Sequence, residues 1–199
     1  MSTVIDPELH RRNFRTVFAL AGLFLLPLVL SFWLYYGLHW RPHGSTNHGE
    51  LIAPVRALPD AALPDAAGRP TGHIFADKWT LVYVGNGSCD ADCRTTLVFM
   101  RQTRLSLNNE MTRVQRVFLA SADCCDRAYL ASQHPGLRVF DASQPAAQPL
   151  LAQFPQRARA QSLFVVDPLG NLMMRYDARL PPKGLLEDLK RLLQLSHIG

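Results

Sequence analysis

The stretch of sequence that decides the fold is Val82-Tyr83-Val84-Gly85-Asn86-Gly87-Ser88-Cys89-Asp90-Ala91-Asp92-Cys93-Arg94-Thr95-Thr96-Leu97. Its first residues belong to a continuous β-branched and aromatic run, residues 79–85, which is typical of a buried strand. Turn-forming residues 86–88 end that strand, and a helix is predicted over residues 90–109. A cysteine pair therefore stands where a buried strand passes into a helix, the edge at which open α/β sheets place their chemistry.

Outward from this stretch, the chain alternates between strand and helix patterns. A second buried strand is predicted over 116–120, and the loop after it carries the adjacent Cys124 and Cys125. The order predicts an α/β sandwich with a central mixed β-sheet flanked by helices, in which an antiparallel hairpin completes the sheet. The other predicted elements are short strands around a turn at 65–68, a short helix over 126–134, a strand over 137–140, a loop over 141–161 with room for a short helix, a hairpin with strands over 162–166 and 172–176, and a last helix after Pro182.

The N-terminal part predicts a membrane anchor. Residues 16–40 contain no Lys, Arg, Asp or Glu, and they end in a cluster of aromatic residues typical of a membrane interface. Such a run is long enough to cross a hydrocarbon core of about 30 Å, and longer than the apolar core of a cleaved signal peptide, which is the alternative interpretation. We therefore expect a retained transmembrane helix over 16–40, a tether over 41–57 and a folded domain over 58–199.

Charge indicates how the anchor is oriented and which partners are excluded. Arg11, Arg12 and Arg15 precede the apolar run, and only Arg41 closely follows it, so the positive-inside rule places residues 1–15 in the cytoplasm. The domain then lies on the periplasmic side of an inner membrane. The formal net charge is +5, and the basic residues are scattered rather than gathered with aromatics, so nucleic acid is not an expected partner.

The four cysteines are too few for a disulfide framework, and their clustering indicates redox or metal chemistry. In Cys89-x-x-x-Cys93 the two sulfurs are placed i, i+4, so they can share one helical face and chelate a soft ion such as Cu(I). The helix terminus favours a thiolate by about 0.3–1 kcal/mol. Asp90 and Asp92 oppose it by a similar amount, so neither cysteine is expected to be strongly activated.

This stretch resembles the Sco/SenC family, in which a strand runs into a Cys-Pro-Asp-x-Cys-Pro-Thr-Thr-Leu-type motif. The hairpin Val165-Val166-Asp167-Pro168-Leu169-Gly170-Asn171 is similar to the family's later hairpin, and Ser121-Ala122-Asp123 occupies the place of its Val-Asp-Pro. The resemblance covers roughly residues 58–195. It implies a thioredoxin-like domain that helps to build the copper centre of cytochrome c oxidase, by binding copper or by reducing the cysteines that receive it.

Carried over to this chain, the resemblance assigns the cysteine pair to Cys89 and Cys93, as a redox dithiol or Cu(I) ligands. The family's distal histidine ligand falls on Arg159, and no histidine occurs between His134 and His197. Two further hypotheses start from Cys124 and Cys125: they complete a thiol-rich Cu(I) site, or one of them resolves a mixed disulfide. The alternative is that both are inert and buried. The weaker candidates are Met173 and Met174 as soft ligands, His39, His43 and His48 as a metal cluster, and Arg157 and Arg159 as neighbours that favour a thiolate.

The leading hypothesis is a membrane-anchored, Sco-like factor for cytochrome c oxidase assembly that uses thiol–disulfide exchange, Cu(I) handling or both at Cys89 and Cys93. Its expected partner is an oxidase subunit or another assembly factor. One alternative is a general membrane-tethered thiol–disulfide oxidoreductase for extracytoplasmic proteins. Another is a non-catalytic assembly partner in which the cysteines are only structural.

Overall fold

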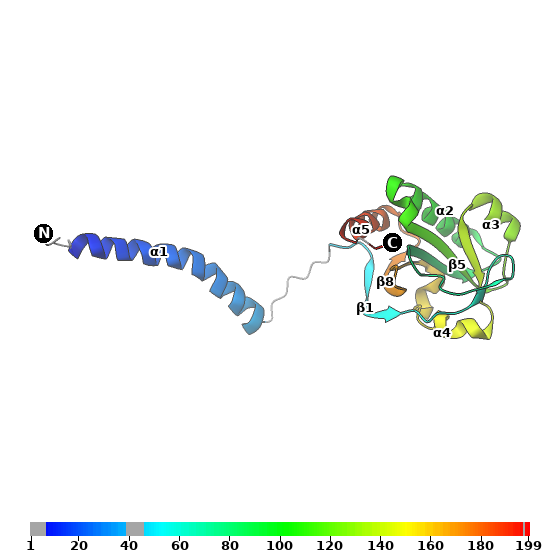
Figure 1. The fold of residues 1–199 in the computed structure, drawn as a ribbon, viewed down its shortest axis with the longest axis horizontal. Helices are drawn as coiled ribbons and strands as arrows, with labels where there is room; N and C mark the ends of the chain where they lie inside the picture. Colours follow the sequence, from blue (N-terminus) through cyan, green and yellow to red (C-terminus); the bar gives the residue numbers. More distant parts are fainter. Residues whose placement is uncertain (1–6, 39–45, 197) are drawn as a thin grey trace. The chain divides into compact units, whose positions relative to one another are not determined.

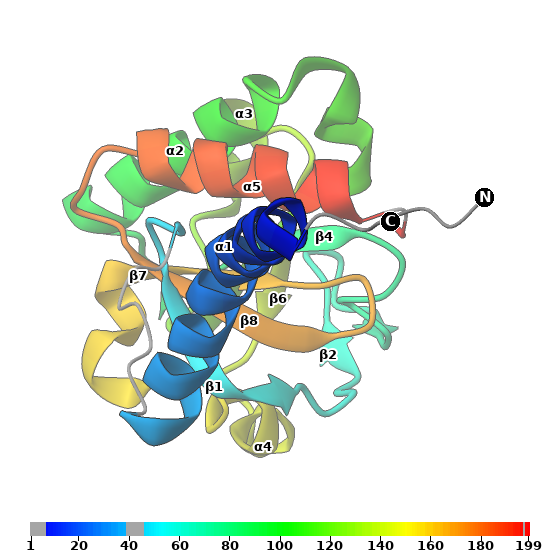
Figure 2. The same cartoon turned by 90° about the vertical axis from the view of Figure 1, so that its left-hand side faces the viewer.

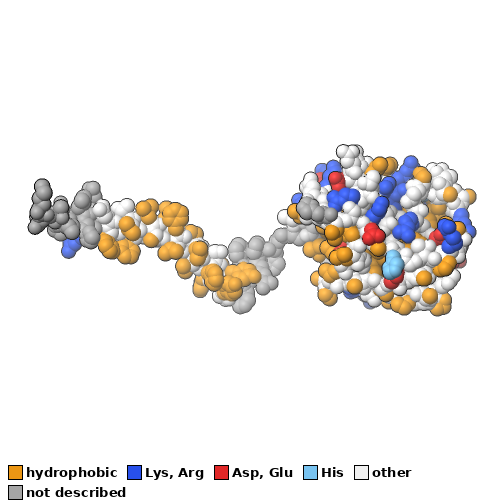
Figure 3. Space-filling view, in the orientation of Figure 1, with side chains coloured by type: hydrophobic (Ala, Val, Ile, Leu, Met, Phe, Trp, Pro, Cys, Tyr) orange, Lys and Arg blue, Asp and Glu red, His pale blue; other side chains and the backbone are white. Residues whose placement is uncertain are grey.

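The computed structural model describes residues 7–38, 46–196 and 198–199, and the chain divides into two units, residues 1–45 and 46–199 (Figure 1). In the first unit, α1 (Pro7–Phe32) continues into the π-helical turn η1 (Trp33–Gly37). Residues 13–37 are long and apolar enough to cross a membrane. Hydrophobic side chains cover much of this helix (Figure 3). The predicted anchor residues 39–40 lie outside the described residues, as do 1–6 of the predicted N-terminal segment and 41–45 of the tether.

The second unit is built on a 6-stranded mixed sheet in the order β1-β8-β7-β4-β5-β6. β4, β5 and β6 are parallel, and β7, β8 and β1 complete the sheet in antiparallel fashion. This is the predicted α/β sandwich with a mixed sheet. The strands are β1 (Glu50–Ala57), β4 (Trp79–Asn86), β5 (Val114–Ala122), β6 (Leu137–Asp141), β7 (Ser162–Val166) and β8 (Asn171–Asp177), and β2 (Leu63–Pro64) pairs with β3 (Pro70–Thr71) around the predicted turn.

Helices cover both faces of the sheet (Figure 2). On one face lie α2 (Ala91–Leu105), α3 (Arg127–Gln133) and α5 (Lys183–Leu195), and on the other lies α4 (Gln148–Leu151). Because successive side chains of a strand point to opposite faces of the sheet, each face packs its own buried cluster against the helices that cover it. Tyr83, Leu97 and Phe118 belong to the α2–α5 layer, and Val84, Phe154 and Phe164 to the α4 layer.

One predicted helix ends earlier than expected, whereas the loop predicted over 141–161 contains short helices, for which the sequence left room. The helix predicted over 90–109 stops at Leu105, and Asn108 adopts a left-handed φ of 51° that no α-helix continues through. A short 3₁₀ helix, η2 (Asn108–Arg113), leads into β5. The loop predicted over 141–161 contains η3 (Pro145–Ala147), α4 and η4 (Gln156–Gln161), which pack Leu150 and Phe154 against the sheet.

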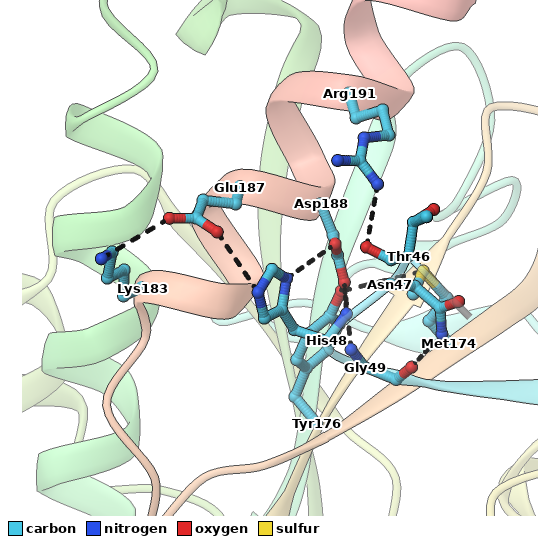
Figure 4. A network of polar contacts seen from close by, with 10 residues as sticks. All are labelled: Thr46, Asn47, His48, Gly49, Met174, Tyr176, Lys183, Glu187, Asp188 and Arg191. Carbon is cyan, nitrogen blue, oxygen red and sulfur yellow. Dashed lines mark hydrogen bonds and ion pairs between the residues drawn. The ribbon is translucent and has the colours of Figure 1, made fainter. Parts of the chain in front are cut away.

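The tether prediction is wrong for residues 50–57, which form the edge strand β1 and pair with β8. Most side chains of β1 are exposed, so the strand lacks the apolar pattern that reveals buried strands in a sequence. The segment before it is fixed to α5 by the buried Asp188 (Figure 4). Its Oδ2 accepts the backbone N–H groups of His48 at 2.7 Å and Gly49 at 3.0 Å, and the hydroxyl of Tyr176 at 2.5 Å. The domain therefore begins before residue 58.

Candidate functional site

Cys89 and Cys93 form a disulfide between the end of β4 and the first turn of α2, with their Cα atoms 5.1 Å apart. The helix begins here because Asp90 is its N-cap, and Asp90 Oδ1 accepts the backbone N–H of Cys93 at 2.9 Å. Cys89 precedes the cap and has a left-handed φ of 48°. The prediction that the sulfurs of Cys89 and Cys93 share one helical face is therefore wrong, because Cys89 lies outside the helix. The pair joins a loop residue to a helix residue.

The Cys89–Cys93 disulfide is buried. Cys89 is 1% exposed and Cys93 is 2% exposed, and both belong to the hydrophobic cluster beneath α2 and α5. Thiol–disulfide exchange requires an attacking thiolate to reach one of the two sulfurs. In this oxidised form, a partner in solution has no direct path to either of them.

Cys124 and Cys125 are also joined to each other, in the loop that follows β5. Both are half-buried rather than buried. Because β4 and β5 are parallel neighbours, their following loops emerge at the same edge of the sheet. Cys124 and Cys125 are therefore not free thiols, and neither of them is bonded to Cys89 or Cys93.

Hydrogen bonds join the two cysteine loops. The backbone N–H of Gly87 donates to Ala122 O at 2.8 Å, and the N–H of Asp126 donates to Gly87 O at 3.1 Å. Asn86 Nδ2 donates to Asp123 Oδ2 at 3.1 Å. The loops after β4 and β5 thus form one layer rather than two independent turns.

Arg94 strengthens this connection from α2. Its Nε donates to Cys89 O at 3.1 Å, and its guanidinium lies over the ring of Tyr129 in α3, with Cζ 4.6 Å from the ring centroid. Its Nη2 lies 4.0 Å from Asp126 Oδ2, a distance that adds only a weak ionic attraction because both side chains are substantially exposed. Arg94 therefore holds the Cys89 backbone against the second cysteine loop. Nothing in the sequence distinguishes it from any other helix-surface arginine.

Tyr83 supports the cysteine site from the sheet. Its hydroxyl donates to Ala160 O at 3.0 Å, and its ring stacks on Phe118 with the centroids 5.6 Å apart. Burial raises the pKa of Tyr83 to about 12, and the nearby carboxylates of Asp90 and Asp92 add to the effect. The sequence shows only an aromatic residue in a strand, so this fixation of the 156–161 segment could not be predicted from it.

Arg159, on which the resemblance places a histidine ligand, binds backbone carbonyls of the α4 region. Its Nη2 donates to Leu151 O at 2.5 Å and to Phe154 O at 3.0 Å, and burial lowers its pKa. Leu151 and Phe154 belong to the buried cluster on the α4 face, opposite the layer that holds Cys89 and Cys93. Arg159 therefore stabilises the local backbone by hydrogen bonds and does not reach the cysteine layer. Arg157 is exposed.

The remaining metal-ligand candidates do not assemble into a site. Among the described residues, no group of three or more His, Cys, Asp or Glu is placed to hold a metal ion. Met174 is buried in the α2–α5 layer, and Met173 packs against the same cluster. His48 Nδ1 lies 3.2 Å from Asp188 Oδ1 and its Nε2 3.3 Å from Glu187 Oε2 (Figure 4), whereas His39 and His43 lie outside the described residues.

Comparison with known proteins places this geometry in a family. Residues 79–196 match the family described as "Transmembrane-like, thioredoxin-like, C-terminal domain". No curated protein matches the sequence. Solved structures with the same fold include the copper-bound form of yeast Sco1, with 14% identity and a TM-score of 0.61 over 70% of this chain and 94% of that one.

Two further structures carry the same fold. Apo Sco1 from Thermus thermophilus has 22% identity and a TM-score of 0.56, over 77% of this chain and 98% of that one. BsSco, described as a member of the Sco family of cytochrome c oxidase assembly proteins with a disulfide switch, has 12% identity and a TM-score of 0.52, over 70% of this chain and 95% of that one. At these identities the likeness establishes the fold, and the predicted thioredoxin-like class is confirmed.

Proposed function

The chain belongs to the family of transmembrane-like, thioredoxin-like C-terminal domains, and from this premise we propose that it is a membrane-anchored, Sco-like factor that assists cytochrome c oxidase assembly. α1 is the anchor, with its N-terminus in the cytoplasm and the domain in the periplasm. The partner is an oxidase subunit or another assembly factor. Cys89 and Cys93 carry the chemistry, which is thiol–disulfide exchange accompanied by handling of Cu(I) as cargo.

The observation that carries this proposal is the Cys89–Cys93 disulfide at the carboxyl end of β4 and the start of α2. In its reduced form the pair is a dithiol that can transfer two electrons to a disulfide in the partner. One thiolate attacks a partner sulfur, the partner's S–S bond breaks and a mixed disulfide forms. The second cysteine then displaces the partner thiolate and closes Cys89–Cys93 again. A partner reduced in this way presents two thiols that can receive copper.

Copper fits this site in part. Two thiolates are soft donors of the kind that Cu(I) prefers. The expected third ligand is replaced by Arg159, which cannot bind a cation and whose guanidinium binds Leu151 and Phe154 carbonyls. Thiol–disulfide exchange is therefore the primary activity in this proposal, and Cys89 and Cys93 hold Cu(I) only as transient cargo.

The same replacement favours one second candidate, a general thiol–disulfide oxidoreductase that serves other extracytoplasmic proteins. A dithiol with no third metal ligand among the described residues needs no copper for its chemistry. The two functions differ in their targets. The first predicts a defect limited to the copper content of the oxidase, and the second predicts misoxidation of many exported proteins.

The test compares the wild-type chain with Cys89→Ser/Cys93→Ser. Cells that carry the variant are assayed for oxidase copper content and for the thiol state of exported proteins. Loss of oxidase copper alone is the expected result. Normal oxidase assembly in the variant would overturn the proposal and leave a non-catalytic assembly partner. In parallel, the reduced full-length chain in detergent is titrated with Cu(I) against a competing chelator, and only weak binding that disappears in the variant is expected.

A further inference from the structure

The two disulfides differ in how a partner can reach them. Cys89 and Cys93 are 1% and 2% exposed, whereas Cys124 and Cys125 are half-buried and line a pocket of about 650 Å³. A reductant in solution therefore meets the Cys124–Cys125 bond first. If exchange at Cys89–Cys93 requires an outside reductant, the buried pair needs a route to it.

The Cys124–Cys125 loop is positioned to provide that route. Both of its cysteines pack against the hydrophobic cluster that contains Cys89 and Cys93. Two backbone hydrogen bonds hold Gly87 between Ala122 and Asp126, so the loops that carry the two disulfides lie against each other. A thiolate formed inside this layer does not need to pass through solvent to attack the buried bond.

We propose that Cys124–Cys125 is a second redox-active disulfide, through which a protein dithiol in the periplasm reduces the buried Cys89–Cys93 disulfide. The inference rests on the proposed exchange chemistry of Cys89 and Cys93, and it names the path by which their disulfide is reduced again after each exchange. It also gives the adjacent cysteines a role other than that of copper ligands or inert core residues.

The transfer takes place in two balanced exchanges. First, a partner thiolate attacks one sulfur of Cys124–Cys125, that S–S bond breaks and a mixed disulfide forms. The second partner thiol then attacks the partner's sulfur in this mixed disulfide and displaces the cysteine thiolate of this chain. The partner leaves as a disulfide, and Cys124 and Cys125 become a dithiol with the two electrons and two protons. A thiolate of this new pair then attacks Cys89–Cys93, and resolution of the mixed disulfide restores Cys124–Cys125 and leaves Cys89 and Cys93 reduced.

The pocket suits a cysteine-bearing protein segment. Its wall includes the apolar side chains of Leu130, Leu137 and Val139 beside the disulfide, which can receive the side chains that flank the attacking cysteine. Arg127, an exposed cation, lines the same pocket, and its backbone N–H donates to Cys125 O at 2.8 Å. Asp65 and Asp141 line the pocket as well, so its charged side chains do not favour an anion, and its apolar wall is the feature that suits a protein segment.

Contact between the two pairs is tested by trapping. In full-length Cys93→Ser/Cys125→Ser, one cysteine of each loop remains, and in Cys89→Ser/Cys124→Ser the other two remain. Each variant is equilibrated in a glutathione redox buffer, and the products are identified by mass spectrometry of unreduced peptides. In at least one variant, the disulfide between the loops is expected to exceed the glutathione adducts by tenfold or more. Glutathione adducts alone in both variants would overturn the proposal.

The direction of transfer is tested by kinetics. Reduced thioredoxin serves as the protein dithiol, and alkylation at timed intervals reports the state of Cys89 and Cys93. Reduction of Cys89–Cys93 is expected to be at least tenfold slower in Cys124→Ser/Cys125→Ser than in wild type, and equal rates would overturn the relay while leaving the proposed function intact. If thioredoxin and dithiothreitol both fail to reduce Cys89–Cys93 in the natively folded wild type, both proposals fail. Circular dichroism checks folding, and Cys124→Ala/Cys125→Ala replaces a serine variant that does not fold.

Discussion

Gly87 lies directly against Cys124. A Cβ placed on Gly87 would stand 2.6 Å from Cys124 Cα and 2.6 Å from Asp123 O, distances that real Cβ atoms essentially never show. The backbone of one cysteine loop therefore approaches the backbone of the other as closely as the absence of a side chain allows. This close approach accompanies the hydrogen bonds that join the two disulfide-bearing loops, and a side chain at position 87 would oppose it.

Gly87→Ala is expected to destabilise the domain by about 1–3 kcal/mol, because the methyl group meets backbone atoms that can yield only if a loop moves. Chemical unfolding of the full-length chain in detergent, followed by circular dichroism, measures the change. The matched control is Gly72→Ala, whose Cβ would meet nothing closer than 3.5 Å. Equal stability of the two variants would contradict the close approach of the loops.

Arg159→Ala is expected to cost about 1–3 kcal/mol of stability, because it removes the side-chain donor to Phe154 O and one of the two donors to Leu151 O, the other being the backbone N–H of Phe154. The reduction potential of Cys89–Cys93 is expected to stay unchanged. Arg157→Ala, at an exposed position, is the control and should change stability by less than about 0.5 kcal/mol. A shifted potential with unchanged stability would instead assign Arg159 to the stabilisation of a thiolate.

Tyr83 makes the stability of the domain sensitive to alkaline pH. Its pKa is raised to about 12 in the folded state, chiefly by burial, against about 10 when unfolded. The neutral hydroxyl therefore contributes stability that is fully present below pH 10, and this contribution is lost as pH rises through 12. Tyr83→Phe should be less stable at neutral pH by about 0.5–1.5 kcal/mol, because the hydrogen bond to Ala160 O is lost.

The test is to measure unfolding of wild type and Tyr83→Phe between pH 9 and 12. Their stabilities should converge as pH rises. Tyr176, whose pKa is also raised, remains in both proteins and cancels in the comparison. A stability difference that does not change with pH would show that Tyr83 ionises normally in the folded protein.

Asp188 is expected to control the attachment of the segment before β1. Burial by itself would raise the pKa of Asp188, but hydrogen bonds from Tyr176, Gly49 and His48 outweigh it, and the pKa lies below its usual value. The charged carboxylate thus contributes stability that is present above the unfolded pKa of about 3.9, and that is lost as pH falls below it. Asp188→Asn should cost about 2–3 kcal/mol at pH 7, because an amide cannot accept all of these bonds.

Two measurements check this prediction. Amide hydrogen exchange at His48 and Gly49 should accelerate in Asp188→Asn, and the stability difference from wild type should shrink between about pH 5 and pH 2. Glu187→Gln is the control, since Glu187 contacts His48 from an exposed position on the same helix. If Glu187→Gln accelerates exchange as much as Asp188→Asn does, the buried carboxylate is not what holds the segment.

The sequence by itself determined the parts of this protein that depend on local pattern. An uncharged apolar run predicted a helix long enough to cross a membrane, the run at 79–85 predicted a central strand, and turn residues predicted the β7–β8 hairpin. In that hairpin Asp167 Oδ1 accepts the backbone N–H groups of Leu169 and Asn171, and Gly170 takes a φ of 85°. These features are visible in a sequence because neighbouring residues encode them through periodicity, charge and turn preference.

The tertiary structure alone decided how distant segments meet. β1 joined the sheet because β8 offers it a hydrogen-bonding edge, and its exposed side chains carry no pattern that predicts this. The side chain of Arg159 bound the carbonyls of Leu151 and Phe154 because the fold brings its guanidinium beside them, although Leu151 O already accepts the backbone N–H of Phe154. The burial of Cys89–Cys93 and the partial exposure of Cys124–Cys125 depend on how α2 and α3 pack over two neighbouring loops. Spacing along the chain carries no information about that packing, because burial is a property of the neighbours that folding brings together.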